Sequence, residues 1–250
     1  MATRFGRFPE FRKRPDSTLT TRASIPCMEP TDSGLTFPRL DDGLTLCSVA
    51  DRALGAFHSL VLDHLLATDG TAVWVDARNT ATTQHLARVA PSRGLLDRIR
   101  VARAFTPFQH YALVDDLAAA VAPDDGLVVA PLVDWFYRED ELRDGEDEAM
   151  LAGALDDLAA LSDRADLPVL LSRHAASGVG SVVDRYVDRR LDCTLTAFGP
   201  RFSGDEFETL LFDCPDGTVQ TTLAFWRRAL RERHRAAATD GPEVALGGSH

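Results

Sequence analysis

Short apolar runs rich in β-forming residues alternate with segments of helical period from Leu44 onward, and no other feature of the 250-residue chain restricts its fold as much. The runs predict strands at 45–49, 71–76, 99–104, 126–133 and 169–172. The segments between them predict helices at 53–67, 82–89, 109–121 and 148–164. Because parallel strands need crossover connections and helices provide them, the alternation predicts an α/β fold with five parallel strands.

The last part of the chain follows a different pattern. A helix is expected at 182–191, and strands are expected at 193–198, 208–213 and 218–225. The run Pro215-Asp216-Gly217 predicts a tight turn before the last of these strands. This part is therefore expected to form an antiparallel extension of the sheet.

The two ends of the chain show neither period. Residues 1–33 combine Pro, Ser, Thr and Arg with scattered Phe and are expected to form a disordered arm, and the Gly-rich residues 236–250 are expected to form a disordered tail. A single domain is expected over 34–235. The basic cluster from Arg4 to Arg14 fits either phosphate contacts or a solvated tail.

Composition restricts the partners that the chain can have. Carboxylates outnumber basic residues by 38 to 27, the formal net charge is −11, and Lys13 is the only lysine. This balance argues against broad affinity for nucleic acid. An acidic, lysine-poor composition is typical of proteins from salt-loving archaea, and a GC-rich genome is the alternative explanation.

Several kinds of site are not indicated. The four cysteines have no CxxC spacing, and the histidines form no HxxxH or HExxH pattern, so no metal site is expected. No run approaches the roughly 18 apolar residues of a membrane span. We therefore expect no membrane partner and a cytoplasmic location.

The segment from Val101 to Phe105, with Gln109-His110 and Leu113-Val114 after it, closely resembles a segment of the ATPase core of archaeal RadA and its recombinase relatives in the RecA superfamily. Residues 73–80 are similar to that family's second strand and loop, and residues 127–138 fit its Walker B strand. The resemblance covers about residues 40–225. It implies a RecA-like P-loop NTPase fold, with a mostly parallel sheet, crossover helices and a C-terminal antiparallel extension.

The phosphate-binding loop of such a fold requires GxxxxGK[ST], because backbone N–H groups surround the phosphates, the lysine balances their charge and the hydroxyl holds magnesium. The matching segment runs from Ala50 to Phe57 and keeps only Gly55. Ala56 stands in place of the lysine. Phe57 stands in place of the hydroxyl, with its ring directed either toward the would-be phosphate or into the core.

The other catalytic positions that the resemblance implies are also replaced. Arg78 stands in place of the glutamate that polarises water, Pro131 in place of the Walker B aspartate, and His174 near the place of a glutamine that senses the γ-phosphate. Asp134 comes three residues after Pro131 and is expected to be a surface or loop carboxylate. The chain is thus predicted not to hydrolyse ATP and to need no cofactor.

A non-catalytic paralogue that binds a protein partner, either a recombinase or another DNA-processing protein in recombination or repair, is the function that this resemblance favours. An alternative is a nucleotide or anion binder whose site is rebuilt from Arg52, Arg78 and Arg173. A signalling relative of the KaiC branch is a third alternative; it fits the fold but not the stretch from Val101 to Phe105.

Three basic or loop segments are candidates for contact with a partner or with nucleic acid. The segment 172–180 occupies the place of a DNA-binding loop in recombinases, but a plain connector is favoured because it has few basic and aromatic residues. Arg185 and Arg189 are expected one turn apart on a helix, as salt-bridge partners. The candidate surface for a partner, or more weakly for nucleic acid, is a basic helix at the C-terminal end that carries Arg227, Arg228 and Arg231.

Overall fold

The computed structural model describes residues 37–49, 54–138, 142–143, 145–176, 178–196, 199–204, 230–231 and 234–235. The arm expected at 1–33, the tail expected at 236–250 and the strands expected at 208–213 and 218–225 lie outside these residues. Ala50, Arg52, Arg227 and Arg228 also lie outside them.

The described residues form an α/β fold around a seven-stranded sheet with the order β3-β2-β4-β5-β1-β6-β7. These strands are β1 (Gly43–Val49), β2 (Thr71–Asp76), β3 (Ile99–Arg103), β4 (Asp125–Ala130), β5 (Pro168–Leu171), β6 (Arg189–Thr196) and β7 (Gly199–Gly204). All neighbouring pairs are parallel except β6 and β7, which pair antiparallel. The expectation of a mostly parallel sheet with an antiparallel end is confirmed, although the parallel part includes β6 as well as the five expected strands.

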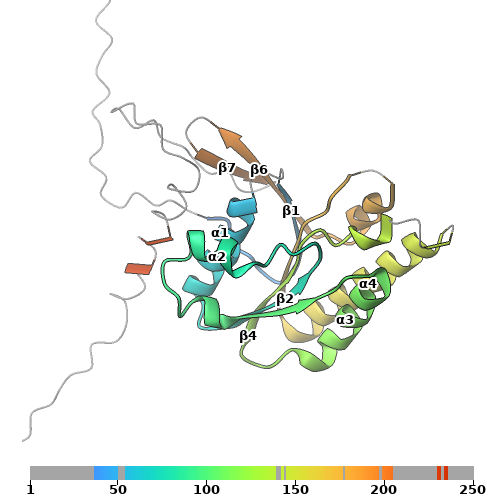
Figure 1. The fold of residues 1–250 in the computed structure, drawn as a ribbon, viewed down its shortest axis with the longest axis horizontal. Coiled ribbons are helices and arrows are strands. Elements are labelled where there is room, and N and C mark those ends of the chain that lie inside the picture. The colour runs from blue at the N-terminus through green and yellow to red at the C-terminus, as the bar shows by residue number, and fades with distance from the viewer. Residues whose placement is uncertain are drawn as a thin grey trace, which may run out of the picture. The chain divides into compact units, whose positions relative to one another are not determined.

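Helices cover both faces of the sheet (Figure 1). One face carries α1 (Leu54–Ala67) and α2 (Thr83–Val89), and the other carries α3 (Pro107–Ala120) and α4 (Glu146–Ala165). Side chains that alternate along β2 face the two cores in turn: Trp74 packs with the α1 side, while Val73 and Val75 pack with the α3 and α4 side. Both faces of the strand are thus covered, as its continuous apolar run predicts.

Hydroxyl caps fix the starts of two helices. The side chain of Thr82 accepts a hydrogen bond from the backbone N–H of His85 at the start of α2, and Thr106 accepts one from Gln109 at the start of α3. Pro107 occupies the first turn of α3, where its missing N–H has no helical partner to lose. The loops after β2 and β3 therefore end at defined residues.

The strand expected at 126–133 is shorter than predicted. β4 ends at Ala130, and the chain turns over the next five residues before the short helix η3 (Phe136–Arg138). Pro131 has no N–H to donate to a neighbouring strand, and Leu132 adopts a left-handed backbone with φ of +51°. Both features end the strand pairing.

The prediction of a helix at 182–191 is wrong. The structure has a 3-10 helix, η4 (Gly178–Arg185), and then β6, which pairs parallel with β1. Arg185 and Arg189 therefore do not share a helix face. Arg189 pairs with Asp41 and donates to the carbonyl of Asp42, and Arg190 pairs with Asp184. Pairing with a free edge of β1 decides the structure here, and local periodicity carries no information about that edge.

The strand expected at 193–198 is the second part of β6, and β7 was not predicted. Among the helices that the structure describes, none combines the length and the apolar character that crossing a membrane requires.

Candidate functional site

Four neighbouring strands of the sheet, β2, β4, β5 and β1, end at the same edge because they are parallel. The loops that follow them lie along this carboxyl edge, which is where open α/β sheets place their ligands. Arg78 follows β2, Pro131 follows β4, and His174 follows β5. The positions that the sequence singled out are thus brought to one edge of the sheet, and we treat this edge as the candidate site.

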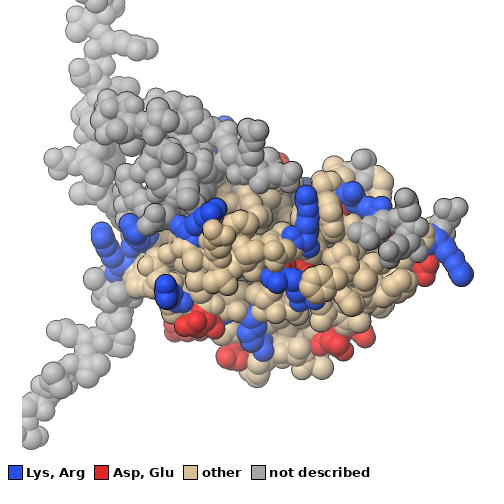
Figure 2. Space-filling model, in the orientation of Figure 1, with Lys and Arg blue, Asp and Glu red and all other residues tan. Residues whose placement is uncertain are grey.

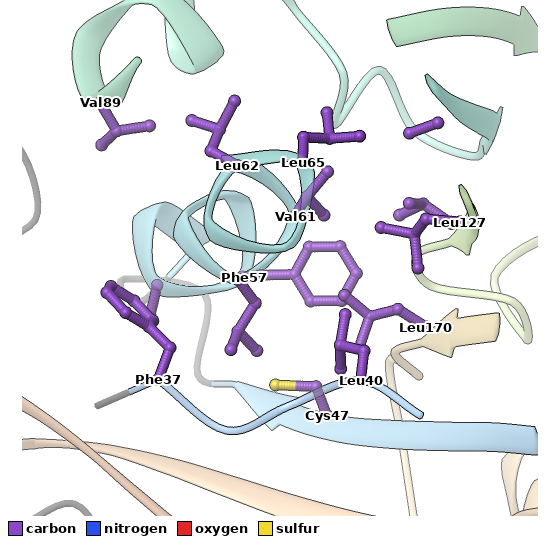
Figure 3. Packing of buried hydrophobic residues seen from close by; sticks show 14 of the residues in the cluster. Phe37, Leu40, Cys47, Phe57, Val61, Leu62, Leu65, Val89, Leu127 and Leu170 are labelled. Atoms are coloured by element: carbon purple, nitrogen blue, oxygen red, sulfur yellow. The ribbon is translucent and has the colours of Figure 1, made fainter. Parts of the chain in front are cut away.

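The first turns of α1 are part of the core. Ala56 and Phe57 are fully buried, and the Phe57 ring meets Trp74 edge-to-face with 6.0 Å between the ring centroids. Figure 3 shows this ring pointing from α1 toward Leu127 and Leu170 of the sheet. The sequence left two orientations of the Phe57 ring open, and in the structure the ring is directed into the core. A lysine or a hydroxyl at these two positions would face apolar side chains.

Gly55 is the one glycine that matches the expected phosphate-binding loop, and the surrounding packing does not require a glycine at this position. A Cβ atom added there would meet nothing within 4 Å, and Gly55 is not among the residues of positive φ.

The buried Asp76 carboxylate at the end of β2 organises the next loop. Its Oδ1 accepts hydrogen bonds from the backbone N–H of Thr80 at 2.8 Å, from the Thr80 hydroxyl at 2.5 Å and from the N–H of Ala81 at 3.3 Å. Its Oδ2 accepts from Nε of Arg103 at 3.0 Å. With this anchor, the loop holds Arg78 in a left-handed conformation, with φ of +60°.

Trp135 gathers the side chains that follow three different strands. The guanidinium carbon of Arg78 lies 4.2 Å from the ring centroid of Trp135, and that of Arg138 lies 5.1 Å from it. The His174 ring meets the same indole edge-on, 4.9 Å away. We call Arg78, Trp135, Arg138 and His174 the Trp135 cluster. It stands on a small apolar base formed by Ala77, Ala104 and Phe136.

Asp134 lies in a loop but is fully buried, so the expectation of an exposed carboxylate at the surface is wrong. Its oxygens accept hydrogen bonds from the backbone N–H groups of His174 at 2.6 Å and Ala175 at 3.1 Å. The turn after Pro131 redirects the side chain toward the loop after β5. Ser172 adds a second link, because its hydroxyl accepts from the N–H of Leu132 at 3.0 Å.

Arg173 does not join the cluster. It forms an ion pair with Asp184 at 2.8 Å and donates to the carbonyl of Gly180 at 3.2 Å. The hydrogen bond from Arg173 is the main cause that lowers the pKa of Asp184 below its usual value. Of the three arginines proposed for a rebuilt anion site, only Arg78 is placed at the Trp135 cluster, and Arg52 is outside the described residues.

Near the C-terminal end of the described chain, Arg231 is exposed and follows Leu230, which is buried in the same core cluster as the α1 side chains. Figure 2 shows basic side chains spread as a band across the face in view, with acidic side chains gathered mainly along its lower margin. The negative net charge of the chain is therefore not distributed evenly over this face.

Two buried histidines lie near the carboxyl edge. His58 on α1 shares a hydrogen bond of 3.1 Å with the carbonyl of Thr80, and Nδ1 of His110 on α3 lies 2.8 Å from the hydroxyl of Tyr137. Burial lowers the pKa of each histidine to about 4. Both rings are consequently neutral at pH 7, and the Thr80 carbonyl requires the tautomer of His58 that carries its proton on Nε2.

Within the part of the chain that the structure describes, no group of three or more His, Cys, Asp or Glu side chains is arranged to hold a metal ion. Comparison with protein-family models and with curated proteins finds no match for this chain.

The sequence did not identify three residues of the site: Trp135, Arg138 and the buried role of Asp134. A tryptophan shortly after the end of a strand, in the segment that follows Pro131, is the signal that could have pointed to Trp135. Arg138 carries no such signal, because its position beside Trp135 depends on the turn that begins at Pro131.

Proposed function

We propose that the chain is a RecA-like protein without ATPase activity that acts by binding a protein partner. The sheet order supports the RecA-like part of this proposal. The resemblance requires the loops after the first, second, fourth and fifth strands to meet around one site, and β2, β4, β5 and β1 are consecutive neighbours in the sheet. The absence of ATPase activity is supported by the packing of Ala56 and Phe57 in the core and by the stacking of Arg78 on Trp135.

An exposed apolar surface carries the proposal of a partner. Three large hydrophobic side chains are exposed among the described residues: Val101 at 42%, Phe105 at 72% and Phe108 at 56%. Val101 lies on β3, Phe105 in the loop that follows it and Phe108 in the first turn of α3, so all three fall within eight residues of sequence. Exposed apolar side chains that gather in one place are typical of interaction sites.

The position of β3 indicates how the partner would bind. β3 is an edge strand, and its only neighbour in the described sheet is β2. One side of its backbone therefore offers N–H and C=O groups to another strand, and an extended peptide commonly binds such an edge as an additional strand. The edge also carries Arg100 and Arg103, whose side chains are 50% and 37% exposed.

The partner segment we propose is an extended one, with apolar side chains at alternate positions. The resemblance assigns this segment to a recombinase or another DNA-processing protein. Phe105 and Phe108 would then pack on the partner at the end of the added strand.

The test is binding of the wild-type chain and of a Phe105→Ser/Phe108→Ser double variant to the recombinase of the same cell, measured by calorimetry. We expect the double variant to weaken binding by at least about tenfold, since each exposed phenylalanine would bury a large apolar area. Leu66→Ser on α1 is the control, because Leu66 is a partly buried hydrophobic residue on the opposite side of the sheet from α3. Amide exchange in β3 should slow when the partner is bound.

Equal affinity of the double variant and the wild type, or unchanged amide exchange in β3, would contradict the proposed surface. If the wild-type chain hydrolysed ATP faster than an Ala56→Lys/Phe57→Thr variant, the proposed absence of ATPase activity would be contradicted.

A further inference from the structure

Two arginines share one aromatic ring in the Trp135 cluster. Arg78 comes from the loop after β2 and Arg138 from the short helix η3 that follows β4, and both guanidinium carbons lie within about 5 Å of the Trp135 ring centroid. The two groups are therefore separated by no more than the sum of these two distances. Two cations so close repel each other, and each stacking contact at an exposed site offsets only a small part of that repulsion.

No described carboxylate compensates this charge by an ion pair with either arginine. The nearest acidic groups have other partners: Asp76 binds Arg103, Thr80 and Ala81, and Asp134 accepts from the backbone of His174 and Ala175. Arg78 and Arg138 are both exposed. The two positive charges therefore lie close together, face solvent and have no ion-pair partner among the described carboxylates.

The backbone around the cluster is fixed in unusual conformations. Arg78 and Asn79 are consecutive residues with φ near +60°, and Leu132 has φ of +51°. None of these residues is glycine, so the conformations cost free energy and must be held by their surroundings. The Asp76 hydrogen bonds hold the first loop, and the Ser172 and Asp134 hydrogen bonds hold the second. The guanidinium groups are accordingly preorganised.

We infer that the Trp135 cluster is a binding site for a ligand that carries two linked phosphate groups, with Arg78 and Arg138 each holding one phosphate. A guanidinium presents a planar set of donors that matches phosphate oxygens, and the indole beneath it fixes the plane of that set. The exposed His174 ring lies at the edge of the same indole, beside the position of the ligand. This site does not use the loop between β1 and α1, and it is independent of the proposed partner surface on β3.

The experiment is a calorimetric titration with inorganic pyrophosphate in a buffer that contains EDTA, at two concentrations of potassium chloride. We expect saturable binding that weakens as salt rises, because the attraction between exposed charges is screened. Arg78→Ala and Arg138→Ala should each reduce the affinity by at least about tenfold. Arg88→Ala, at an exposed arginine in the last turn of α2, should leave the affinity unchanged.

A Lys variant separates charge from geometry. Arg138→Lys keeps the charge and loses the planar stacking, so it should bind pyrophosphate with an affinity between those of the wild type and Arg138→Ala. Indole fluorescence gives a second readout: the change on binding should disappear in Trp135→Phe, which leaves Trp74 and Trp226 in place.

The source of the phosphates is tested by comparing pyrophosphate with ADP under the same conditions. Tighter binding of ADP would assign a nucleotide, and equal affinities would assign the polyphosphate alone; both outcomes support the site. No saturation at millimolar pyrophosphate, or equal affinities of the wild type, Arg78→Ala and Arg138→Ala, would overturn it.

Discussion

Asp134 shows how a single buried carboxylate can join two loops of the site. Its two hydrogen bonds run to backbone N–H groups that follow β5, while the residue itself follows β4. The pairing between β4 and β5 ends at Ala130 and Leu171, so these bonds continue the link between the two segments beyond the sheet. Trp135 and His174 meet just outside this link.

Replacing Asp134 by alanine should destabilise the fold by about 3 kcal/mol, because two backbone N–H groups would lose their partners in a buried place. Asp134→Asn keeps one acceptor oxygen and should cost less. Asp116→Ala, at an exposed position of α3, is the matched control. Urea unfolding measures all three, and equal stability of Asp134→Ala and the control would show that water satisfies the freed groups.

Substituting alanine for either of two glycines is expected to have opposite effects on stability. A Cβ atom on Gly180 would lie 2.0 Å from the carbonyl oxygen of Ala175 and 2.8 Å from Oδ2 of Asp134, so Gly180→Ala must displace backbone and should cost about 2 kcal/mol or more. Gly55→Ala meets no atom and lies in α1, where alanine is favoured over glycine. We expect its stability in urea to equal or exceed that of the wild type. A loss in Gly55→Ala would indicate a constraint other than space.

At the scale of elements, α1 places the segment that resembles a phosphate-binding loop next to the core. Phe57 packs against Trp74 of β2 and lies in the same cluster as Leu127 of β4 and Leu170 of β5. Phe57 thus belongs to the cluster that joins α1 to three strands. Placing the residues of a phosphate-binding loop at positions 56 and 57 would remove this packing.

The variant Ala56→Lys/Phe57→Thr should therefore lose stability without gaining ATPase activity. Phe57→Thr leaves a cavity that costs about 3–5 kcal/mol, and a lysine at the buried position 56 adds an uncompensated charge. Phe57→Leu is the control, since it keeps an apolar side chain. Thermal unfolding together with phosphate release measures both effects, and a stable variant that hydrolyses ATP would contradict the packing argument.

The sequence predicted the elements whose own residues determine them. The continuous apolar runs of β1, β2, β4 and β5 and the 3.6-residue period of α4 required no knowledge of the rest of the chain. The segment 182–191 could not be predicted in this way, because its strand forms only beside β1. The Trp135 cluster could not be predicted for a related reason. Arg78 and Arg138 lie 60 positions apart in connecting segments that show no hydrophobic period, and only the sheet order brings them to one ring.

For the whole molecule, His58 and His110 make the two layers of helices sensitive to acid in the same way. His58 belongs to the α1 layer and His110 to the α3 layer, and both are buried without a carboxylate partner in hydrogen-bond contact. Each has a pKa of about 4 in the folded chain and an ordinary value of 6.5 when unfolded. Between these two values the unfolded chain binds more protons than the folded one.

Stability should consequently be full above pH 6.5 and fall as the pH is lowered toward 4, by up to about 1.4 kcal/mol per pH unit for each histidine. Urea unfolding between pH 8 and 5 measures this slope. His110→Gln removes one titrating ring, so its stability should depend less steeply on pH in this range than that of the wild type. The lowered pKa of Asp184 does not contribute here, because its effect on stability is lost only below the ordinary value of 3.8. An unchanged slope in His110→Gln would mean that His110 is protonated in the folded chain, and that the α3 layer admits water around its ring.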